Sequence, residues 1–557
     1  MAKFATILDG INYIEKNFTV VDTIYVDQYI ATPIDLYLRL QKNYKNEYSA
    51  NERIVLVVTQ DFYKDHQPGI MLHSIQNMLD DIDISNFFVC VVTTNSDIQN
   101  EYETLQQNTN IINKFENFFI CQGAWSKHIA TTQVVFTKYH SFQNYLDQVS
   151  KLTEKNKNYL FNSTTFCMAP WVGVSVSTNG QVKTCPISST VIGNCNSQSL
   201  HEIWNSKEMK LLRANMLSEQ TIPSCKNCYN NEQLGIKSLR NSYNKSFVKR
   251  VYKIDSTASD GYLDDFSLNF IDARFTNLCN LVCRTCDSQN SSSWHRPSVA
   301  LKLTTKHTPA LLVAGRSDSD LIDQVIDHVE HLDRIYFCGG EPMMIKQFYD
   351  LLEVLDSKSR HDIELIYNIN LTRLSLKHQN IFDLWKNFRN ISIGASLDGE
   401  YERGEYIRIG TNWNDVLINR QQMIDQRPDI DFYARSTVSI LNVLHLPDFH
   451  KSWSEKGLIT PDQYDIGILF EPLHFAIHTA PDWLKDQIKN KYKKHLEWLR
   501  PKDRLGRATN GFQSVLNRIE TPGNFDKDNF WREIDLLDNM YKMKFDDVFP
   551  ELKELPR

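Results

Sequence analysis

A chain of 557 residues is too long for a single ordinary hydrophobic core, and a length of this size predicts roughly three domains. Its 61 Lys and Arg residues against 68 Asp and Glu residues give a formal net charge of −7. Because the sequence has no strongly basic block, this charge balance argues against non-specific binding to nucleic acid.

The amino-terminal sequence 1–18 lacks the basic segment, apolar run and small-residue cleavage site of a secretory signal. No apolar segment is long enough to span a bilayer, so we expect a cytoplasmic protein without a membrane partner. In a reducing compartment, its 11 cysteines are expected to be metal ligands or buried side chains rather than disulfides.

Residues 1–155 alternate apolar runs with helix-like stretches, which predicts an α/β domain of Rossmann-like type. The apolar runs lie at 53–59, 87–95, 118–122 and 132–137, with an amphipathic helix expected over 71–84. No glycine-rich phosphate loop follows a strand, so no dinucleotide site is predicted. We expect this domain to recognise a substrate or a partner.

Cysteines, turn residues and short strands replace this pattern over residues 156–250. One amphipathic helix is expected over 199–217. This composition predicts a small cysteine-rich domain that is held together by a metal site.

Six strand-like runs alternate with helices over residues 251–480, which predicts a partial (β/α)6 barrel of the TIM-like type. The runs are 266–274, 334–340, 363–369, 391–399, 431–440 and 464–470. In such a barrel the active site lies at the carboxyl ends of the strands. Residues 481–557 predict a helical C-terminal region.

Cys279, Cys283 and Cys286 form a Cys-x3-Cys-x2-Cys group directly after the first predicted barrel strand. A closed zinc or iron–sulfur site usually takes four protein ligands. Three thiolates on a four-iron cluster would leave one iron open to a small molecule, which is a physical use for a missing fourth cysteine.

This spacing in this place resembles the radical S-adenosylmethionine (radical SAM) superfamily, and the resemblance covers residues 262–475. It implies a [4Fe–4S] cluster whose open iron is chelated by the amino and carboxylate groups of S-adenosylmethionine. An electron from the cluster would then cleave the sulfonium to a 5′-deoxyadenosyl radical.

Further segments resemble the cofactor-binding motifs of that superfamily. The run Gly339, Gly340, Glu341, Pro342 resembles its Gly-Gly-Glu-Pro motif, which receives the methionyl amino group. The resemblance also implies cofactor-binding roles for Asn370 in the third strand, Ser396 and Asp398 of "SLDG", Arg408, and Asn442 near the adenine pocket. In the family the Ser and Arg of this set hold the methionyl carboxylate. Each segment alone would also suit a turn, a strand-end cap or a surface ion pair.

The sequence departs from the family at Thr285, where an aromatic residue often stacks near adenine. Cys338 lies inside the second barrel run, and we interpret it as a buried strand residue.

A second cysteine group, Cys167, Cys185, Cys225 and Cys228, resembles the SPASM and twitch auxiliary-cluster domains of radical SAM enzymes. The resemblance implies one auxiliary iron–sulfur cluster, of the [4Fe–4S] type, with Cys195 as a non-ligand. Four thiolates suit a structural zinc ribbon equally well, and spacing alone does not separate the two. In the family this domain follows the barrel, whereas here it precedes it.

Glu471, His474 and His478 follow the sixth predicted strand and are candidate substrate or proton-transfer groups near the barrel mouth. A histidine beside aromatic residues is otherwise a packed, hydrogen-bonded side chain.

Taken with the resemblance, these motifs predict a radical SAM enzyme that abstracts hydrogen from a peptide or protein side chain, or from a small molecule. The auxiliary cluster would accept or relay an electron or help hold the substrate, and a flavodoxin or ferredoxin would supply the reducing electron. The alternative is a non-catalytic iron–sulfur or zinc protein that uses the barrel as a binding scaffold.

Overall fold

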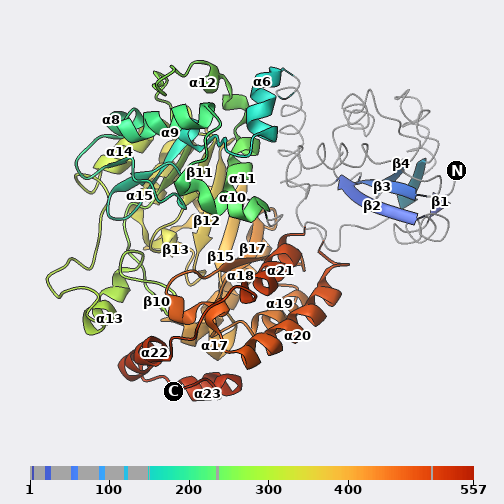
Figure 1. Cartoon of the computed structure of the whole chain (residues 1–557), viewed down its shortest axis with the longest axis vertical. Helices are drawn as coiled ribbons and strands as arrows, with labels where there is room; N and C mark the ends of the chain where they lie inside the picture. Colours follow the sequence, from blue (N-terminus) through green and yellow to red (C-terminus); the bar gives the residue numbers. More distant parts are fainter. Residues whose placement is uncertain are drawn as a thin grey trace. The chain divides into compact units, whose positions relative to one another are not determined.

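The computed structural model describes residues 149, 151–233, 238–503 and 506–557, together with five strands among the first 148 residues (Figure 1). The chain divides into two compact units, Met1–Leu152 and Thr153–Arg557. Each unit is described by itself.

The described strands of the first unit form one parallel sheet in the order β1-β5-β4-β3-β2. They are β1 (Lys3–Phe4), β2 (Thr19–Val26), β3 (Glu52–Thr59), β4 (Phe87–Thr93) and β5 (Phe118–Gln122). Three of the predicted apolar runs are therefore strands. The run at 132–137 and the helix expected over 71–84 lie outside the described residues. Parallel neighbours need crossover connections, as an α/β arrangement requires.

A nine-stranded sheet forms the centre of the second unit, in the order β18-β17-β15-β12-β11-β9-β6-β7-β8. Six of its strands are parallel neighbours in chain order: β9 (Phe270–Ala273), β11 (Arg334–Phe337), β12 (Glu364–Ile369), β15 (Ile391–Ser396), β17 (Asp431–Val438) and β18 (Tyr464–Ile468). These strands fall in the six predicted runs, so the prediction of an α/β fold on a large parallel sheet is confirmed. Closure into a partial barrel stays a prediction.

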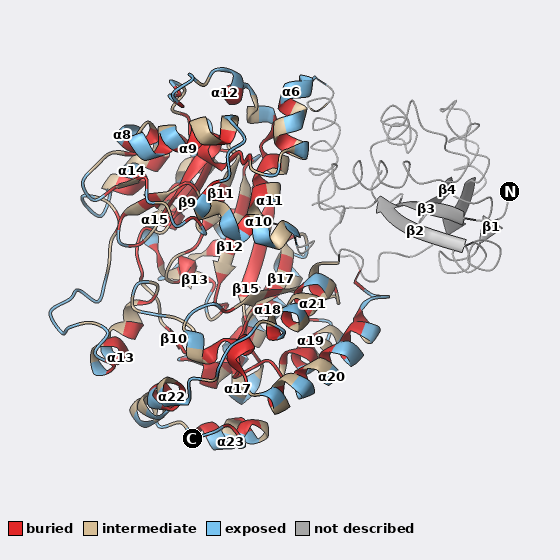
Figure 2. Ribbon diagram, in the orientation of Figure 1, coloured by how far each residue is buried: buried red, intermediate tan, exposed pale blue. Residues whose placement is uncertain are grey.

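The strands of this sheet are largely buried (Figure 2). In β11, β12 and β17 one face is buried and the opposite face is half-buried, whereas β6 and β9 are buried on both faces. In β12, for example, Leu365, Tyr367 and Ile369 are buried and alternate with half-buried residues. The helices of the β-α units run between successive strands: α14 (Asp320–Ile326), α15 (Lys346–Ser357), α16 (Ile381–Trp385), α17 (Tyr401–Ile407), α18 (Trp413–Gln426) and α19 (Leu446–Glu455). Aromatic packing such as Phe337 on Tyr367, with ring centroids 4.3 Å apart, and Tyr367 on Trp385 of α16 fills the helix-covered face.

The cysteine-rich segment extends the same sheet. Strand β6 (Gly173–Val176) pairs in parallel with β9, and β7 (Gln181–Lys183) and β8 (Gly193–Asn194) continue it in antiparallel pairing. A Cβ atom at Gly173 would lie 2.0 Å from the carbonyl oxygen of Phe270, so only glycine allows the two strands this approach. Segments 156–250 and 251–480 thus share one hydrogen-bonded sheet.

Short helices surround these edge strands. They are α6 (Glu154–Lys157), α7 (Ala169–Val172), α8 (Leu200–Trp204), α9 (Lys207–Leu217), α10 (Lys226–Gln233), α11 (Leu239–Ser246) and α12 (Tyr252–Asp255). The prediction of a single helix over 199–217 is wrong, because α8 ends at Trp204 and α9 begins at Lys207. The Oγ atom of Ser206 caps this second helix by accepting from the N–H of Met209 at 3.2 Å.

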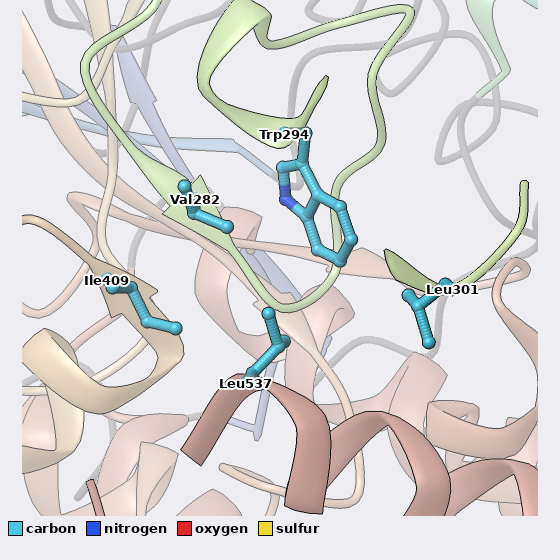
Figure 3. Close-up of a cluster of buried hydrophobic side chains, with 5 residues drawn as sticks. All are labelled: Val282, Trp294, Leu301, Ile409 and Leu537. Carbon is cyan, nitrogen blue, oxygen red and sulfur yellow. The ribbon is translucent and has the colours of Figure 1, made fainter. Parts of the chain in front are cut away.

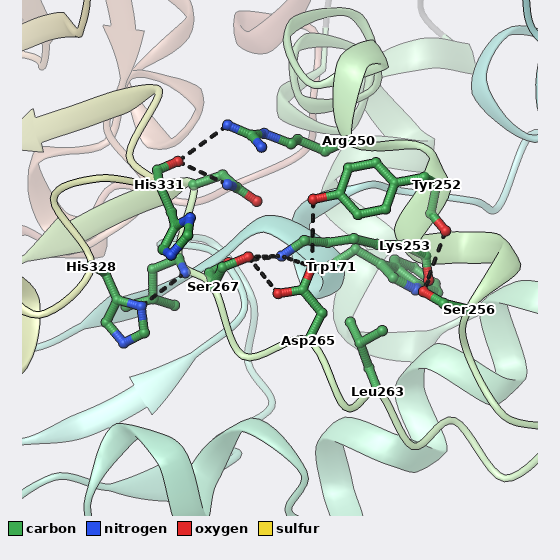
Figure 4. Close-up of polar contacts among 12 residues, drawn as sticks. Trp171, Arg250, Tyr252, Lys253, Ser256, Leu263, Asp265, Ser267, His328 and His331 are labelled. Atoms are coloured by element: carbon green, nitrogen blue, oxygen red, sulfur yellow. Dashed lines mark hydrogen bonds and ion pairs between the residues drawn. The ribbon is translucent and has the colours of Figure 1, made fainter.

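A buried lysine joins α12 to the chain that leads into β9 (Figure 4). The Lys253 ammonium donates to the carbonyl oxygen and hydroxyl of Ser267 at 2.7 and 2.8 Å, and Asp265 lies 3.6 Å away. Burial lowers the pKa of Lys253 to about 8. A buried ammonium is tolerated here because polar oxygens surround it.

The C-terminal region consists of α20 (Asp482–Leu499), α21 (Arg507–Ile519), α22 (Lys527–Tyr541) and α23 (Phe545–Val548). Beyond the main sheet and its helices lie α13 (His295–Ala300) and two small ladders, β10 (Val282–Cys283) with β16 (Arg408–Ile409) and β13 (Ser375–Leu376) with β14 (Gln379–Asn380). Among the described helices, none combines the length and apolar character that crossing a bilayer requires.

Two buried histidines pack α20 against α19. Nε2 of His450 lies 2.9 Å from the carbonyl oxygen of Pro461, and its Nδ1 lies 3.0 Å from Nε2 of His495. Because a carbonyl only accepts, His450 carries its proton on Nε2, and His495 donates to the free Nδ1. Burial lowers the pKa of both side chains below the ordinary value. Both histidines are therefore neutral in the folded protein.

We expect the free energy of unfolding to fall as pH falls below about 6.5, because the unfolded chain then binds protons that the folded pair does not. His495→Gln keeps a donor toward His450 and removes one titrating group, so it should reduce that slope by about 1.4 kcal/mol per pH unit. Urea unfolding at several pH values measures the slope. His307→Gln, at an exposed position, is the control, and equal slopes for His495→Gln and the parent would contradict the expectation.

Candidate functional site

Cys279, Cys283 and Cys286 lie in the loop after β9, at the carboxyl edge of the sheet. Cys283 belongs to β10, which pairs with β16 so that Cys283 lies opposite Arg408. The N–H of Cys286 donates to the carbonyl oxygen of Cys283 at 3.0 Å, and Nε1 of Trp294 donates to the same oxygen at 2.7 Å. These hydrogen bonds fold the loop back on itself around the carbonyl group of Cys283. We call residues 279–286 the cysteine loop.

The surroundings of these thiols disfavour the charged thiolate form unless a positively charged group is present. Burial, followed by the neighbouring Cys283 and Glu341, raises the pKa of Cys279 to about 12. Burial and the neighbouring Cys283 also raise the pKa of Cys286 well above its usual range. Neighbouring thiolates repel one another, and positively charged iron would relieve that repulsion. The donor set therefore fits an iron–sulfur cluster.

The Gly-Gly-Glu-Pro segment passes directly against the cysteine loop. Gly339 and Gly340 have φ values of +86° and +53°, and a Cβ atom at Gly340 would lie 2.2 Å from the carbonyl oxygen of Leu278. That oxygen accepts a hydrogen bond from the N–H of Glu341 at 2.8 Å. The glycines are thus required for packing against the loop, a role that the motif alone did not reveal.

Glu341 links this segment to the residue that follows β12. Its buried carboxylate accepts from the N–H of Met343 at 3.1 Å and from the N–H of Asn370 at 2.7 Å. Burial raises its pKa to about 7, although both N–H groups act in the opposite direction. The amide of Asn370 in turn donates to Oδ1 of Asn280, in the cysteine loop, at 2.9 Å.

Arg408 is held between a carboxylate and a cysteine. Its Nε lies 2.9 Å from Oδ2 of Asp398, and its Nη1 donates to Sγ of Cys283 at 3.5 Å. Asp398 is anchored by the N–H of Thr437 at 2.7 Å, and its carbonyl oxygen accepts from Nδ2 of Asn442 at 3.0 Å. Asn442 therefore supports Asp398, which orients Arg408 toward the loop.

Ser396 ends β15, two residues before Asp398, and is in register with Arg435 of β17. Ser396 and Arg435 are both half-buried and lie on the same face of the sheet. The structure thus brings Glu341, Asn370, Asp398 and Arg408 into direct contact with the cysteine loop or its partners.

The candidate catalytic residues contact the C-terminal helices instead. Nε2 of His474 lies 3.0 Å from Oε2 of Glu533 in α22, and Nδ1 of His478 lies 3.3 Å from Nη2 of Arg518 in α21. Glu471 is exposed. Within the described residues, none of Glu471, His474 and His478 makes a polar contact with the cysteine loop.

The second cysteine group surrounds one cavity. Cys167 precedes α7, Cys185 follows β7, Cys225 ends a short 3₁₀ turn and Cys228 lies in α10. All four line the cavity together with Arg240 and Tyr243, whereas Cys195 is not among its lining residues. Burial raises the pKa of Cys185 to about 12.

Arg240 brings a positive charge to this cavity. It pairs with Glu232 and donates to the carbonyl oxygen of Phe166 at 2.7 Å, next to Cys167 in the chain. Four thiols beside a fixed guanidinium form a donor set suited to an anionic metal–thiolate group. The residues therefore fit a closed four-cysteine site.

The two cysteine sites lie at opposite ends of the sheet. Because β6 is parallel to β9, its start lies at the end of the sheet opposite to the cysteine loop. Cys167 precedes β6, and the antiparallel return of β7 brings Cys185 back to the same end. The half-buried face of the sheet, formed by alternate residues of β11, β12 and β17 with Ser392 and Ser396 of β15, lies between these two ends.

That face carries polar residues that sequence reasoning missed. Nδ2 of Asn368 donates to Oη of Tyr336, and Nε of Arg435 lies 3.6 Å from Asp465. A Cβ atom at Gly394 would lie 2.9 Å from Oδ1 of Asn368 and 3.0 Å from Oη of Tyr433, so these side chains meet over the glycine. In "RIYF" and "DFYAR" the residues of this face alternate with apolar residues, and this alternation was the signal that could have found them.

Residues 167–229 match the SPASM family model, which describes an iron–sulfur cluster-binding domain. The match spans all four cysteines of the second group. A search of curated proteins found no match.

Solved structures give weaker similarities. Native anSMEcpe with bound AdoMet and a Cp18Cys peptide is 16% identical with a TM-score of 0.30, over 42% of this chain and 60% of that chain. Native anSMEcpe with bound AdoMet is 17% identical with a TM-score of 0.31, over 42% and 61%. The cobalamin-dependent S-adenosylmethionine radical enzyme OxsB is 10% identical with a TM-score of 0.25, over 96% and 62%. This chain therefore spans about 60% of the first of these proteins.

The family match agrees with the prediction of an auxiliary-cluster domain: the chain carries an iron–sulfur cluster-binding domain of the SPASM family. Its place ahead of the main parallel sheet is a property of this chain.

We expect the four cysteines of this domain to retain iron and sulfide independently of the cysteine loop. A Cys279→Ala, Cys283→Ala, Cys286→Ala variant should therefore stay brown after anaerobic purification. Iron, zinc and acid-labile sulfide analysis measures the content. Adding Cys225→Ala and Cys228→Ala to the triple variant should remove the remaining iron and sulfide. Adding Cys195→Ala instead is the control and should leave them in place. One zinc per chain without sulfide in the triple variant would overturn the assignment.

Proposed function

We propose that this chain is a radical SAM enzyme with a SPASM domain, and that it abstracts hydrogen from a peptide or protein side chain or from a small molecule. The cysteine loop would hold a [4Fe–4S] cluster with one open iron. The single observation that carries the proposal is that Arg408 contacts Cys283 of this loop and Glu341 contacts Leu278 directly before it, since the resemblance assigns both residues to the cofactor.

The residues around the loop suit the two charged ends of a methionyl group. Glu341 offers a carboxylate near the amino group, and Arg408 with Ser396 offers donors for the carboxylate. When bound, S-adenosylmethionine and the cluster would supply a 5′-deoxyadenosyl radical. Asp398 keeps the Arg408 guanidinium in one orientation, so that the carboxylate meets a fixed donor.

The substrate would lie over the half-buried face of the sheet, between the two cysteine sites. Tyr336, Asn368, Tyr433 and Arg435 line this face with hydrogen-bonding groups, which supports a polar substrate group. The SPASM cysteines at the far end would then hold the cluster that accepts or relays an electron, or would help hold the substrate. Glu471 and His474 remain proposed proton-transfer groups.

The remaining assignments belong to the same proposal. An external donor such as flavodoxin or ferredoxin would reduce the cluster in the cytoplasm, and residues 1–155 would recognise the substrate or a partner protein. The auxiliary cluster would be of the [4Fe–4S] type.

The deciding experiment is 5′-deoxyadenosine formation after anaerobic reduction with S-adenosylmethionine. The parent protein should form it, because the cysteine loop would hold the cleaving cluster. The Cys279→Ala, Cys283→Ala, Cys286→Ala variant should form none. A parent protein that forms none would favour a non-catalytic scaffold, and undiminished formation in the variant would refute the role of the loop.

We expect Arg408→Ala to weaken S-adenosylmethionine binding by roughly tenfold to a hundredfold, because hydrogen bonds to charged groups contribute about 1.5–3 kcal/mol. Arg408→Lys should restore part of the lost affinity, since an ammonium keeps the charge but cannot donate two parallel hydrogen bonds to a carboxylate as a guanidinium does. Asp398→Asn should also weaken binding, and Ser396→Ala should weaken it less than Arg408→Ala. Anaerobic titration measures the affinity.

The matched control is Arg427→Ala. Arg427 precedes β17, at the opposite end of the sheet, where it pairs with Asp429 at 2.6 Å and donates to the carbonyl oxygens of Trp385 and Phe388. It should keep the parent affinity. Parent affinity in Arg408→Ala would instead make Arg408 an ordinary ion-pair residue.

A further inference from the structure

The C-terminal helix α22 packs directly against the cysteine loop. An apolar cluster joins them and consists of Val282, Trp294, Leu301, Ile409 and Leu537 (Figure 3). Val282 and Ile409 are the residues next to Cys283 and Arg408, and Leu537 comes from α22. The apolar cluster therefore covers the β10–β16 ladder with a helix that is more than 100 residues distant in sequence from either strand.

A buried arginine of the cysteine loop makes a second contact with α22. Arg284 follows Cys283 and is 0% exposed. Its Nη2 donates to Oδ1 of Asp538 in α22 at 2.5 Å, and its Nε donates to the carbonyl oxygen of Tyr406 at 3.0 Å. The guanidinium carbon lies 3.8 Å from the centroid of the Tyr406 ring.

Asp538 is itself held in place by two further donors. Oη of Tyr406 donates to its Oδ1 at 2.7 Å, and the N–H of Phe545 donates to its Oδ2 at 2.8 Å. Tyr406 also packs edge-on against Phe549, with ring centroids 5.1 Å apart. The carboxylate thus has a fixed position between α17, α22 and the chain end.

The cost of burying a charge makes the Arg284–Asp538 contact a constraint on the conformation of the loop. A charged guanidinium without water is tolerated only when it is paired and hydrogen-bonded. The described partners of the Arg284 side chain are the Asp538 carboxylate, the Tyr406 carbonyl group and the Tyr406 ring. Without Asp538, Arg284 would regain a favourable environment only by moving toward solvent, and the adjacent Cys283 and the loop would move with it.

We propose that Asp538 is a positioning residue of the cofactor site, and that the C-terminal helix α22 holds the cysteine loop in its ligand-binding conformation through Arg284. The importance of this contact for S-adenosylmethionine cleavage rests on the proposed function. The effect on the loop itself does not, because it concerns only the conformation of residues 279–290.

The control for this proposal is another ion pair between α17 and the chain end. Arg403 of α17 pairs with Glu551, with Nη2 3.1 Å from Oε2. Neither residue makes a polar contact with the cysteine loop in the described part of the chain. Glu551→Gln therefore loosens the C-terminal segment without touching Arg284.

The experiment compares hydrogen–deuterium exchange in full-length, anaerobically purified Asp538→Asn, Glu551→Gln and parent proteins. Asp538→Asn should raise exchange in the peptide covering 279–290 by roughly tenfold, with little change in β11, β12 and β15. Glu551→Gln should leave that peptide at the parent rate. Asp538→Glu, which keeps the charge, should restore part of the protection.

A second readout is cluster content. Asp538→Asn should lose iron from the cysteine loop on gel filtration while the SPASM site keeps its own. If Asp538→Asn does not fold, Tyr406→Phe removes one donor to Asp538 and should give a smaller rise in loop exchange. Unchanged loop exchange in a folded variant, or an equal rise in Glu551→Gln, would overturn the proposal. A parent protein that never cleaves S-adenosylmethionine would defeat only the proposed function.

Discussion

The guanidinium of Arg408 lies between the carboxylate of Asp398 and the sulfur of Cys283, and the carboxyl edge of the sheet is arranged around it. Arg408 and Cys283 lie opposite each other in a ladder of only two residue pairs, β10 with β16. So short a ladder has little stability of its own. It is supported by Asp398, two residues after β15, and α22 packs on it through Leu537 and Asp538.

The placement of the two cysteine sites follows from a single pairing of strands. Because β6 runs parallel to β9, the hairpin of the SPASM segment joins the edge of the main sheet although it precedes that sheet in the chain. Cys167 and Cys185 then lie at the amino ends of the strands, and the cysteine loop lies at the carboxyl ends. The order of domains in sequence therefore does not determine the order of the sites in space.

Most of the carboxyl-edge site was predictable because its residues follow strands. Parallel strands bring their carboxyl ends together, so Glu341, Asn370 and Asp398 had to lie near the loop after β9 once the strands were known. The roles of individual residues were less predictable. Asn442 hydrogen-bonds the backbone of Asp398, and Gly340 makes room for Leu278, because both contacts depend on how loops cross.

The candidate catalytic residues after β18 could not be placed from their position in the sequence. His474 and His478 follow β18 in sequence, but Glu533 and Arg518 of the C-terminal helices are their partners. The polar row on the half-buried face was readable from its alternation, yet that pattern does not say which face is covered by helices.

By itself, the sequence determined the local features of this protein, the cysteine spacing and the six strand runs, each of which depends on residues close together in the chain. Only the tertiary structure decided that β6 joins β9, that Arg408 lies opposite Cys283 and that Asp538 binds Arg284. The last two pairs are separated by 125 and 254 residues. Such contacts follow from the packing of whole elements, because a buried charge or an unpaired strand edge accepts whichever distant partner the fold brings to it.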